Sequence, residues 1–483
     1  MSVYKSLFKQ TLIYGLATVL PRMISFMLNP LYVHALPKAE FADVSIIFAY
    51  LVFFNVILSY GMETAFFRFY NIEEDKKNVI STSTVSLFWS SIIFLCISLI
   101  YRETIADWIN VKTEYITYTI WILVLDALVI IPFSKFRAES RPMKYAVIKI
   151  ANVGINFGLN IFFLMVLPNL SKDNILSTFY FENFQVGYIF VSNLLASLFT
   201  FIVVSNNYFK INWHFDYELW KKMMRYGLPI LIAGIGFAIN EHFDKILLEK
   251  FNVPKADIGA YSACYKLGMF MVLFRTAYTL GIEPFFFSHA DKENASQTYA
   301  TITKYFVISG SFILLFVIVF IDLLKQLLVP SPKYWDAMNV VPLIVLANFF
   351  LGIYTNLSVW YKLINKTHVG AIISIFGALL TLLFNFWLVP TLSYYGSAIA
   401  TIVAYGSMMI ISYYLGQKKY PIPYDMEKII GYIGVSTLLS TLSFYVPILR
   451  NSYIFGIFAL ILFAYYIYRN EKTTILKILK KQQ

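Results

Sequence analysis

Charged side chains inside long apolar stretches mark the places where this chain could do chemistry. Arg22 is the single charged residue between Lys9 and His34. A helix from Thr11 to Leu31 would just cross a bilayer and hold Arg22 near the middle, where an arginine costs at least ~2.5–3.5 kcal/mol. One interpretation is a structural arginine bonded to kinked backbone beside Pro21. We favour the other, a cation that faces a watery cavity and binds an anion.

Four further cations are candidates for the same task. Lys266 and Arg275 lie in the apolar stretch 258–281. Nine residues in one helix correspond to about 180°, so the two should not share a face. Lys266 is predicted to face the cavity, whereas Arg275 either does so or snorkels towards the cytoplasmic end. Arg68 and Arg137 lie at inner mouths of spans, where solvation or lipid contact explains them as well as substrate capture does.

Three acidic residues are candidates for ion coupling. Asp126 is the only charge between Glu114 and Lys135. It either forms an ion pair or hydrogen bond within the first half of the chain, with Arg22 as one partner, or binds H⁺ or Na⁺. Glu241 and Asp244 end a later span beside His242, where they gate, coordinate a cation or are solvated at the interface. We favour solvation.

Cofactors are not expected. The five histidines show no metal-site spacing, and the sequence has no Walker lysine motif or glycine-rich nucleotide loop, so ATP use is not expected. Coupling of transport to H⁺, to Na⁺ or to the membrane potential stays open.

The elements that must position these residues are membrane helices. The chain is 59% hydrophobic and 14% charged, whereas soluble domains are about 45–50% apolar and ~25% charged. The sequence therefore predicts an all-α polytopic membrane protein. The expected spans number fourteen: 11–31, 42–62, 79–100, 116–136, 145–167, 184–206, 226–247, 258–281, 301–328, 338–361, 368–390, 395–416, 427–447 and 452–468.

The basic residues orient these spans. Most of the 39 lysines and arginines lie in the ends and loops on one side, which by the positive-inside rule places both termini in the cytoplasm. This bias also accounts for the net charge of +12, so a nucleic-acid partner is not expected. The partners expected at this stage are membrane lipids.

One connection is predicted to be a domain linker, residues 207–225. It carries apolar side chains at helical spacing, followed by basic ones, and so predicts an amphipathic helix on the anionic inner leaflet. The residues concerned are Trp213, Tyr217, Trp220 and Met224, then Lys221, Lys222 and Arg225. The predicted parts are an N-lobe of residues 1–206, the linker, a C-lobe of residues 226–416, and two further spans with a basic tail in residues 417–483.

An internal repeat supports the two lobes. Four markers recur in the same order at offsets of 212 to 225 residues: 14–16 with 226–228, 37–40 with 254–257, 61–67 with 281–287, and Asn160 and Pro168 with Asn385 and Pro390. Six spans separate the copies, so both have the same orientation. A parallel repeat of this kind predicts two six-helix lobes around a central cavity, as in transporters.

The chain resembles the multidrug/oligosaccharidyl-lipid/polysaccharide (MOP) exporter superfamily, and within it the polysaccharide-biosynthesis branch of Wzx-type O-antigen and capsule repeat-unit flippases. The likeness covers almost the whole chain through loose motifs: 14–16 with Arg22, 61–63 leading to 67–70, 136–142, 226–229, 244–245, 259–262 and 265–267. Family relatives often carry Asp-Arg where this chain has Asp244-Lys245, and lysine lacks the bidentate fork of arginine.

The resemblance implies a transporter, not an enzyme, in the bacterial inner membrane. It implies alternating-access flipping of a polyprenyl-diphosphate-linked oligosaccharide to the outer leaflet, with other polysaccharide-assembly proteins as further partners. Embedded cations would offset the diphosphate charge. The expected substrate-binding residues are therefore Arg22, Lys266, Arg275, Arg68 and Arg137. Two alternatives stay open: an exporter of small organic cations, and a membrane polymerase or glycosyltransferase. Such an enzyme usually needs a larger outer loop than residues 168–183.

Overall fold

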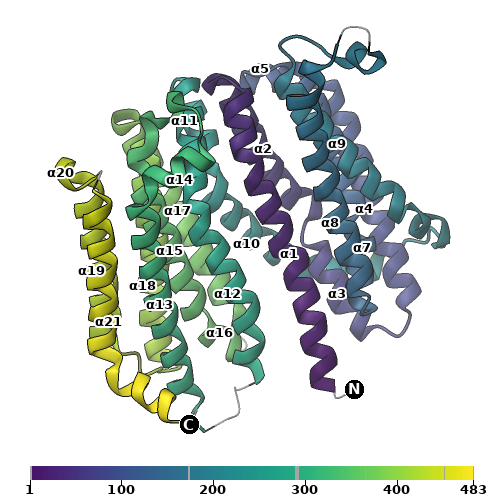
Figure 1. Cartoon of the computed structure of the whole chain (residues 1–483). Helices are drawn as coiled ribbons and strands as arrows, with labels where there is room; N and C mark the ends of the chain where they lie inside the picture. Colours follow the sequence, from purple (N-terminus) through teal and green to yellow (C-terminus); the bar gives the residue numbers. More distant parts are fainter. Residues whose placement is uncertain (1–2, 172–173, 289–292, 365, 451, 482–483) are drawn as a thin grey trace. The chain divides into compact units, whose positions relative to one another are not determined.

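The computed structural model describes residues 3–171, 174–288, 293–364, 366–450 and 452–481, and every regular element in them is helical (Figure 1). Twelve helices in these ranges are long and apolar enough to cross a membrane. The all-α polytopic fold is confirmed. The expected spans 258–281 and 427–447 are helical but are not among these twelve.

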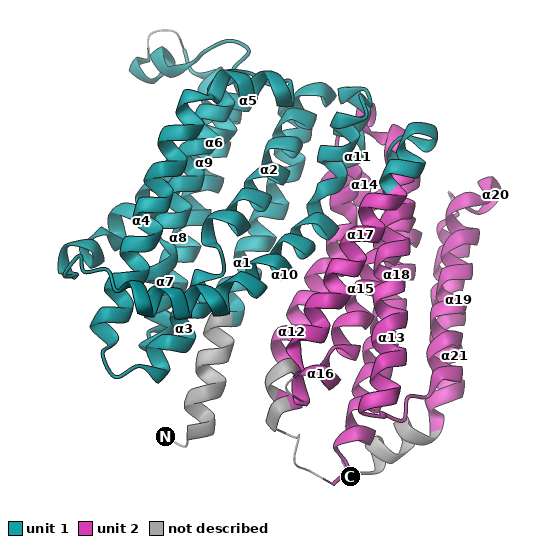
Figure 2. Cartoon of the chain, turned by 180° about the vertical axis from the view of Figure 1, so that it is seen from behind, with its two compact units in different colours: residues 1–262, 385–394 teal, residues 263–384, 395–483 magenta. Residues whose placement is uncertain are grey.

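The chain divides into two compact units (Figure 2). Unit 1 comprises residues 1–262 and 385–394, and unit 2 comprises residues 263–384 and 395–483. They are defined by packing alone. The lobes of residues 1–206 and 226–416 remain a prediction.

Unit 1 is built from the first eleven α-helices and short 3-10 and π turns. Helix α1 packs on α8, α2 on α10 and α6, and α6 on α9. The bounds are α1 Val3–Ala35, α2 Lys38–Ser59, α3 Met62–Ile72, α4 Lys76–Ile100, α5 Arg102–Ile109, α6 Thr113–Leu128, α7 Ile130–Ala138, α8 Pro142–Ile161, η1 Phe162–Val166, η2 Leu167–Asn169, η3 Ile175–Phe179, α9 Gln185–Val204, η4 Ser205–Lys210, α10 Tyr217–Lys250 and α11 Lys255–Tyr265.

Unit 2 contains the remaining helices. Helix α13 packs on α19, α15 and α21, and α12 packs on α15. The bounds are η5 Lys266–Gly268, α12 Met269–Ser288, α13 Ala295–Val319, α14 Ile321–Leu328, η6 Pro332–Val340, α15 Val341–Leu357, α16 Val359–Leu363, α17 Thr367–Leu392, α18 Tyr394–Lys419, α19 Met426–Tyr445, α20 Pro447–Arg450 and α21 Tyr453–Lys481. The last turns of α17 lie in unit 1.

A glycine ends α2 at its junction with α3. Gly61 has φ +74°, a left-handed conformation that side chains with a Cβ rarely adopt. A Cβ at this position would lie 2.3 Å from the carbonyl oxygen of Gly227 in α10. The backbones of α2 and α10 can therefore meet here only because residue 61 has no side chain.

The predicted amphipathic helix of residues 207–225 is formed only in part: residues 217–225 begin α10, whereas residues 211–216 are not helical. The chain is extended between η4 and α10, so Trp213 precedes the helix that contains Trp220. Polar side chains of α4 hold this extended segment: Ser81 bonds the backbone of His214 in both directions, at 2.7 and 2.9 Å, and Thr82 accepts from the Asp216 N–H at 3.1 Å. These side chains offer the backbone partners that an isolated helix would have supplied itself.

Candidate functional site

A buried ion pair lies at the end of α10. Asp244 and Lys245 are 5% and 8% exposed, and the Lys245 Nζ lies 3.0 Å from both carboxylate oxygens. The Tyr261 hydroxyl of α11 donates to Asp244 Oδ2 at 2.7 Å. The favoured solvated position is wrong for Asp244, because α11 covers it. These partners compensate a carboxylate that would otherwise be costly to bury. Glu241, one turn earlier, is half-buried.

Asp126 lies in a polar seam within unit 1. It accepts a hydrogen bond from Ser197 of α9 at 2.8 Å and one from Asn55 of α2, and Lys149 of α8 is a nearby cation. Three helices thus direct polar groups towards one carboxylate. Such a group can hold a proton or a small cation inside the membrane.

The seam continues along α8 and was missed from sequence. Asn152 donates to Thr200 Oγ1 at 2.9 Å, and Asn160 donates to Asn156 Oδ1 at 2.7 Å. Asn160 is fully buried, and its own Oδ1 has no hydrogen-bond partner among the described residues. The signal was present as three asparagines at i, i+4 and i+8, which share one helix face.

Arg68 and Arg137 are exposed and already in contact with other side chains. Arg137 Nη1 lies 2.6 Å from Glu63 Oε1, with the two side chains 44% and 51% exposed. The Arg68 guanidinium lies 4.4 Å from the centre of the Tyr226 ring. Exposed pairs of this kind contribute little to stability, so both arginines could exchange these contacts for an anion.

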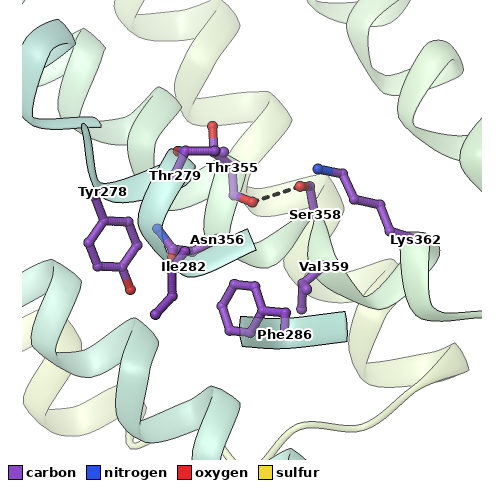
Figure 3. Close-up of a pocket in the computed structure, with 9 residues that line it drawn as sticks. All are labelled: Tyr278, Thr279, Ile282, Phe286, Thr355, Asn356, Ser358, Val359 and Lys362. Carbon is purple, nitrogen blue, oxygen red and sulfur yellow. Dashed lines mark hydrogen bonds between the residues drawn. The ribbon is translucent and has the colours of Figure 1, made fainter. Parts of the chain in front are cut away.

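A small pocket of about 10 Å³, with room for about one water molecule, lies within unit 2, between α12 on one side and α15 and α16 on the other (Figure 3). Its apolar wall faces hydroxyl, amide and ammonium groups. The lining residues are Tyr278, Thr279, Ile282, Phe286, Thr355, Asn356, Ser358, Val359 and Lys362.

Asn356 is the most informative residue of this pocket. It is 3% exposed, and its amide nitrogen donates to the Gly352 carbonyl at 3.1 Å. Its Oδ1 has no hydrogen-bond partner among the described residues. An unsatisfied buried acceptor costs about 1–3 kcal/mol, so this pocket suits a bound donor of the size of one water molecule.

Arg275 lies one helical turn before Tyr278 on α12. It is 9% exposed, and its Cγ is 3.7 Å from the position a Cβ on Gly352 would occupy. Its stem therefore packs against α15. Lys266 is half-buried in η5. Because η5 interrupts the helix, the predicted 180° separation of the two side chains does not apply.

The structure divides the predicted residues between the two units. Arg22 is exposed on α1 of unit 1, which also holds Arg68, Arg137 and the three acidic candidates, whereas Lys266 and Arg275 belong to unit 2. Among the described residues, no group of three or more His, Cys, Asp or Glu side chains could hold a metal ion.

A comparison with models of protein families shows which family the chain belongs to. The model described as "Polysaccharide biosynthesis protein" matches residues 7–280, more than half of the chain. The chain belongs to this family. The MatE family model also matches, over residues 229–387. A search of curated proteins by sequence found no match.

Solved structures with the same fold are transporters and flippases. The lipid II flippase MurJ in an inward closed conformation is 14% identical, with a TM-score of 0.72 over 95% of this chain and 99% of that one. An inward-facing multidrug resistance MATE transporter is also 14% identical, with a TM-score of 0.66 over 82% and 94%. A MOP transporter from Pyrococcus furiosus, noted for the reverse polarity of its binding pocket, is 15% identical, with a TM-score of 0.57 over 86% and 95%. These likenesses show that the chain shares the fold of these transporters and flippases.

Proposed function

We propose that this transporter flips a polyprenyl-diphosphate-linked oligosaccharide from the cytoplasmic to the outer leaflet, for cell-surface polysaccharide assembly. The observation that carries the proposal is the match of residues 7–280 to the polysaccharide-biosynthesis family. The MurJ neighbour is itself named as a flippase of a lipid-linked substrate. The proposed location is the inner membrane with both termini in the cytoplasm, by the positive-inside rule.

The embedded cations support an anionic substrate. A diphosphate that crosses a region of low dielectric needs compensating positive charge. Arg22 on an exposed face of α1 and Arg275 beside the unit 2 pocket are the proposed contributors, with Lys266 as a third. Arg68 and Arg137 are proposed to meet the substrate first, because their exposed contacts are easily exchanged.

The test is leaflet-resolved labelling of the lipid-linked glycan in cells depleted of the protein and supplied with variants. Arg275→Gln should abolish outer-face display, whereas Arg275→Lys should retain part of it, because an ammonium still offsets the anion as a point charge. Arg22→Gln and Arg22→Lys should behave in the same way. Lys418→Gln, an exposed residue at the end of α18, is the matched control.

The measured quantities are outer-face glycan and the membrane abundance of each variant. Lost display at full abundance supports the role of these arginines in the substrate path. Normal outer-face display with failed chain growth in depleted cells would point to a polymerase instead and refute the flippase.

The MatE match supports a second candidate, export of small organic cations. A cationic substrate would depend on embedded carboxylates, with Asp126 as the first one to test. Asp126→Asn should then abolish drug resistance, whereas Arg275→Gln should leave it intact. Under the flippase proposal Asp126 instead serves coupling to H⁺ or Na⁺, so Asp126→Asn should slow glycan export and leave drug sensitivity unchanged. Glu241 is the next coupling candidate, whereas the Asp244 carboxylate is already paired with Lys245 and Tyr261.

A further inference from the structure

A second hollow lies in unit 1, between the middle of α4 and the start of α10. We name it the linker groove, because the extended segment before α10 forms one of its walls. Its volume is about 590 Å³, within the range of ligand sites. It is lined by Tyr60, Val85, Ser86, Trp89, Ser90, Ile93, Phe215, Trp220 and Met224.

The few polar atoms of the linker groove already bond to one another. The Trp220 indole nitrogen donates to Ser86 Oγ at 2.9 Å, and Ser86 shares a hydrogen bond of 2.7 Å with the Tyr60 hydroxyl. Ser90 donates to the Leu87 carbonyl at 3.1 Å. The remaining wall is aromatic and aliphatic, so the part of an occupant that lies in the groove is apolar.

An apolar stripe leads out of the groove along α4. Trp89 and Ile93 line the groove, and Ile97 and Ile100 continue the same helix face at i+4 and i+3. Their exposed fractions are 57%, 57%, 53% and 76%. In a membrane helix, four exposed apolar side chains on one face contact hydrocarbon. A flexible chain can therefore follow α4 from the groove into the bilayer.

Two cations flank the other end of the groove. Lys221 and Arg225 follow the groove residues Trp220 and Met224 directly in sequence and lie one turn apart on the neighbouring face of α10. Both are exposed, and neither makes an ion pair within the described ranges. The nearby Asp216 carboxylate already accepts hydrogen bonds from the Leu219 N–H and from the Asn78 amide.

Aromatic side chains place this end at the membrane surface. Trp213 and Tyr217 are 47% and 58% exposed, and Phe209 is 85% exposed. Aromatic rings with a polar tip concentrate at the level of lipid headgroups. The groove thus has an apolar exit towards hydrocarbon and a cationic rim at the headgroups, which is the polarity of an anionic phospholipid.

We propose that the linker groove binds one anionic phospholipid of the inner leaflet, with an acyl chain along the α4 stripe and the phosphate at Lys221 and Arg225. The site is distinct from the residues assigned to transport and does not depend on the transported substrate. Because the groove joins α4 to the first turns of α10, a bound lipid would brace this junction in unit 1.

The test measures thermal unfolding of the purified full-length protein with added phosphatidylglycerol or phosphatidylcholine. A ligand that binds only the folded state raises the midpoint as its concentration exceeds its Kd. The unaltered protein should be stabilised more by phosphatidylglycerol than by phosphatidylcholine. Lys221→Gln with Arg225→Gln should weaken phosphatidylglycerol binding about tenfold or more, because each surface cation favours anionic lipid, and should leave the phosphatidylcholine response unchanged.

Three comparisons make the result specific. Lys418→Gln with Lys419→Gln removes two exposed cations of α18 in unit 2 and should keep the full preference for phosphatidylglycerol. Ser90→Phe fills the groove and should lower the response to both lipids. Trp89→Ala removes an exposed wall and should do the same even if Ser90→Phe fails to fold.

Two outcomes would overturn the proposal. One is an undiminished preference for phosphatidylglycerol in the Lys221 and Arg225 double variant. The other is a site that polyprenyl phosphate saturates and phosphatidylglycerol does not, which would make the occupant an isoprenoid instead of a phospholipid.

Discussion

Neutralising Glu471 should destabilise unit 2 strongly. The Glu471 side chain is 2% exposed and lies on the last helix, α21, ten residues before its end at Lys481. It lies 2.8 Å from Lys304 of α13 and 3.3 Å from Lys428 of α19, and it accepts a hydrogen bond of 3.1 Å from Tyr432. One carboxylate therefore holds three helices together.

The magnitude follows from the burial of its partners. Lys304 is 14% exposed, so Glu471→Gln strands a largely buried ammonium, at about 3–5 kcal/mol. Lys428 is 35% exposed and can be solvated, so its share is about 0–1 kcal/mol. The expected loss is about 3 kcal/mol or more, whereas Lys428→Gln alone should cost less than about 1 kcal/mol.

The assay is thermal unfolding of both variants in detergent, with the fraction of folded protein read by size exclusion. At about 2–4 °C per kcal/mol, Glu471→Gln should lower the midpoint by roughly 6–12 °C. A second change, Lys304→Met, removes the stranded ammonium and should recover part of the loss. A midpoint within about 1 °C of the unaltered protein would refute the reasoning, because it would mean that water reaches the Glu471 carboxylate.

Three further predictions concern unit 1. Gly61→Ala should lower the free energy of unfolding by at least about 1–2 kcal/mol because of the positive φ, and by more because the new Cβ would meet the Gly227 carbonyl. Thermal unfolding measures this loss, and an unchanged midpoint would contradict the backbone contact. Lys255 Nζ lies 2.5 Å from Asp43 Oδ1, so Lys255→Gln and Asp43→Asn combined should cost clearly less than the sum of the single changes in a double-mutant cycle; additivity would argue against the pair. Hydrogen bonds from the Leu219 N–H and from Asn78 lower the pKa of Asp216. The ionised carboxylate therefore stabilises the folded protein above the ordinary aspartate pKa, and this stabilisation is lost as pH falls through the lowered pKa. Asp216→Ala should lower the free energy of unfolding by about 1 kcal/mol at neutral pH and make that free energy less dependent on acid pH.

The fold was largely predictable because a membrane helix needs a long apolar stretch, which can be seen directly in the sequence. Apolar length was sufficient to predict all twelve helices that are long and apolar enough to cross a membrane within the described residues, together with two more. The repeated Pro-Lys-Ala-acidic motif also has a structural counterpart, since Pro37 precedes α2 and Pro254 precedes α11. In contrast, Gly61 has a left-handed φ while its sequence equivalent Gly281 lies inside α12. Similar residues at repeated positions therefore need not have the same backbone role.

The partners of the charged residues could not be predicted, because they are contacts between helices. Asp244 is buried by a tyrosine 17 residues away on α11, and periodicity along α10 carries no information about that neighbour. Glu471 follows the predicted span 452–468, yet its helix continues and its partners lie on α13 and α19. Linear sequence shows where a charge lies along a helix but not what covers it.

Two properties separate structural charges from candidates for transport: how deeply the side chain is buried, and whether its hydrogen-bond and ion-pair partners are complete. Asp244 with Lys245, and Glu471 with Lys304, are closed arrangements in which each carboxylate already has a cation and a tyrosine hydroxyl. Such pairs hold helices together, and their removal should lower the amount of folded protein. The pocket beside Arg275 differs, because the buried Asn356 Oδ1 within it has no hydrogen-bond partner among the described residues. An acceptor kept unsatisfied at a cost of about 1–3 kcal/mol indicates a place where a donor binds, and the pocket volume of about 10 Å³ fits one water molecule. Arg275, one helical turn before the pocket residue Tyr278, is the place to begin testing the proposed substrate path, and the closed pairs are its stability controls.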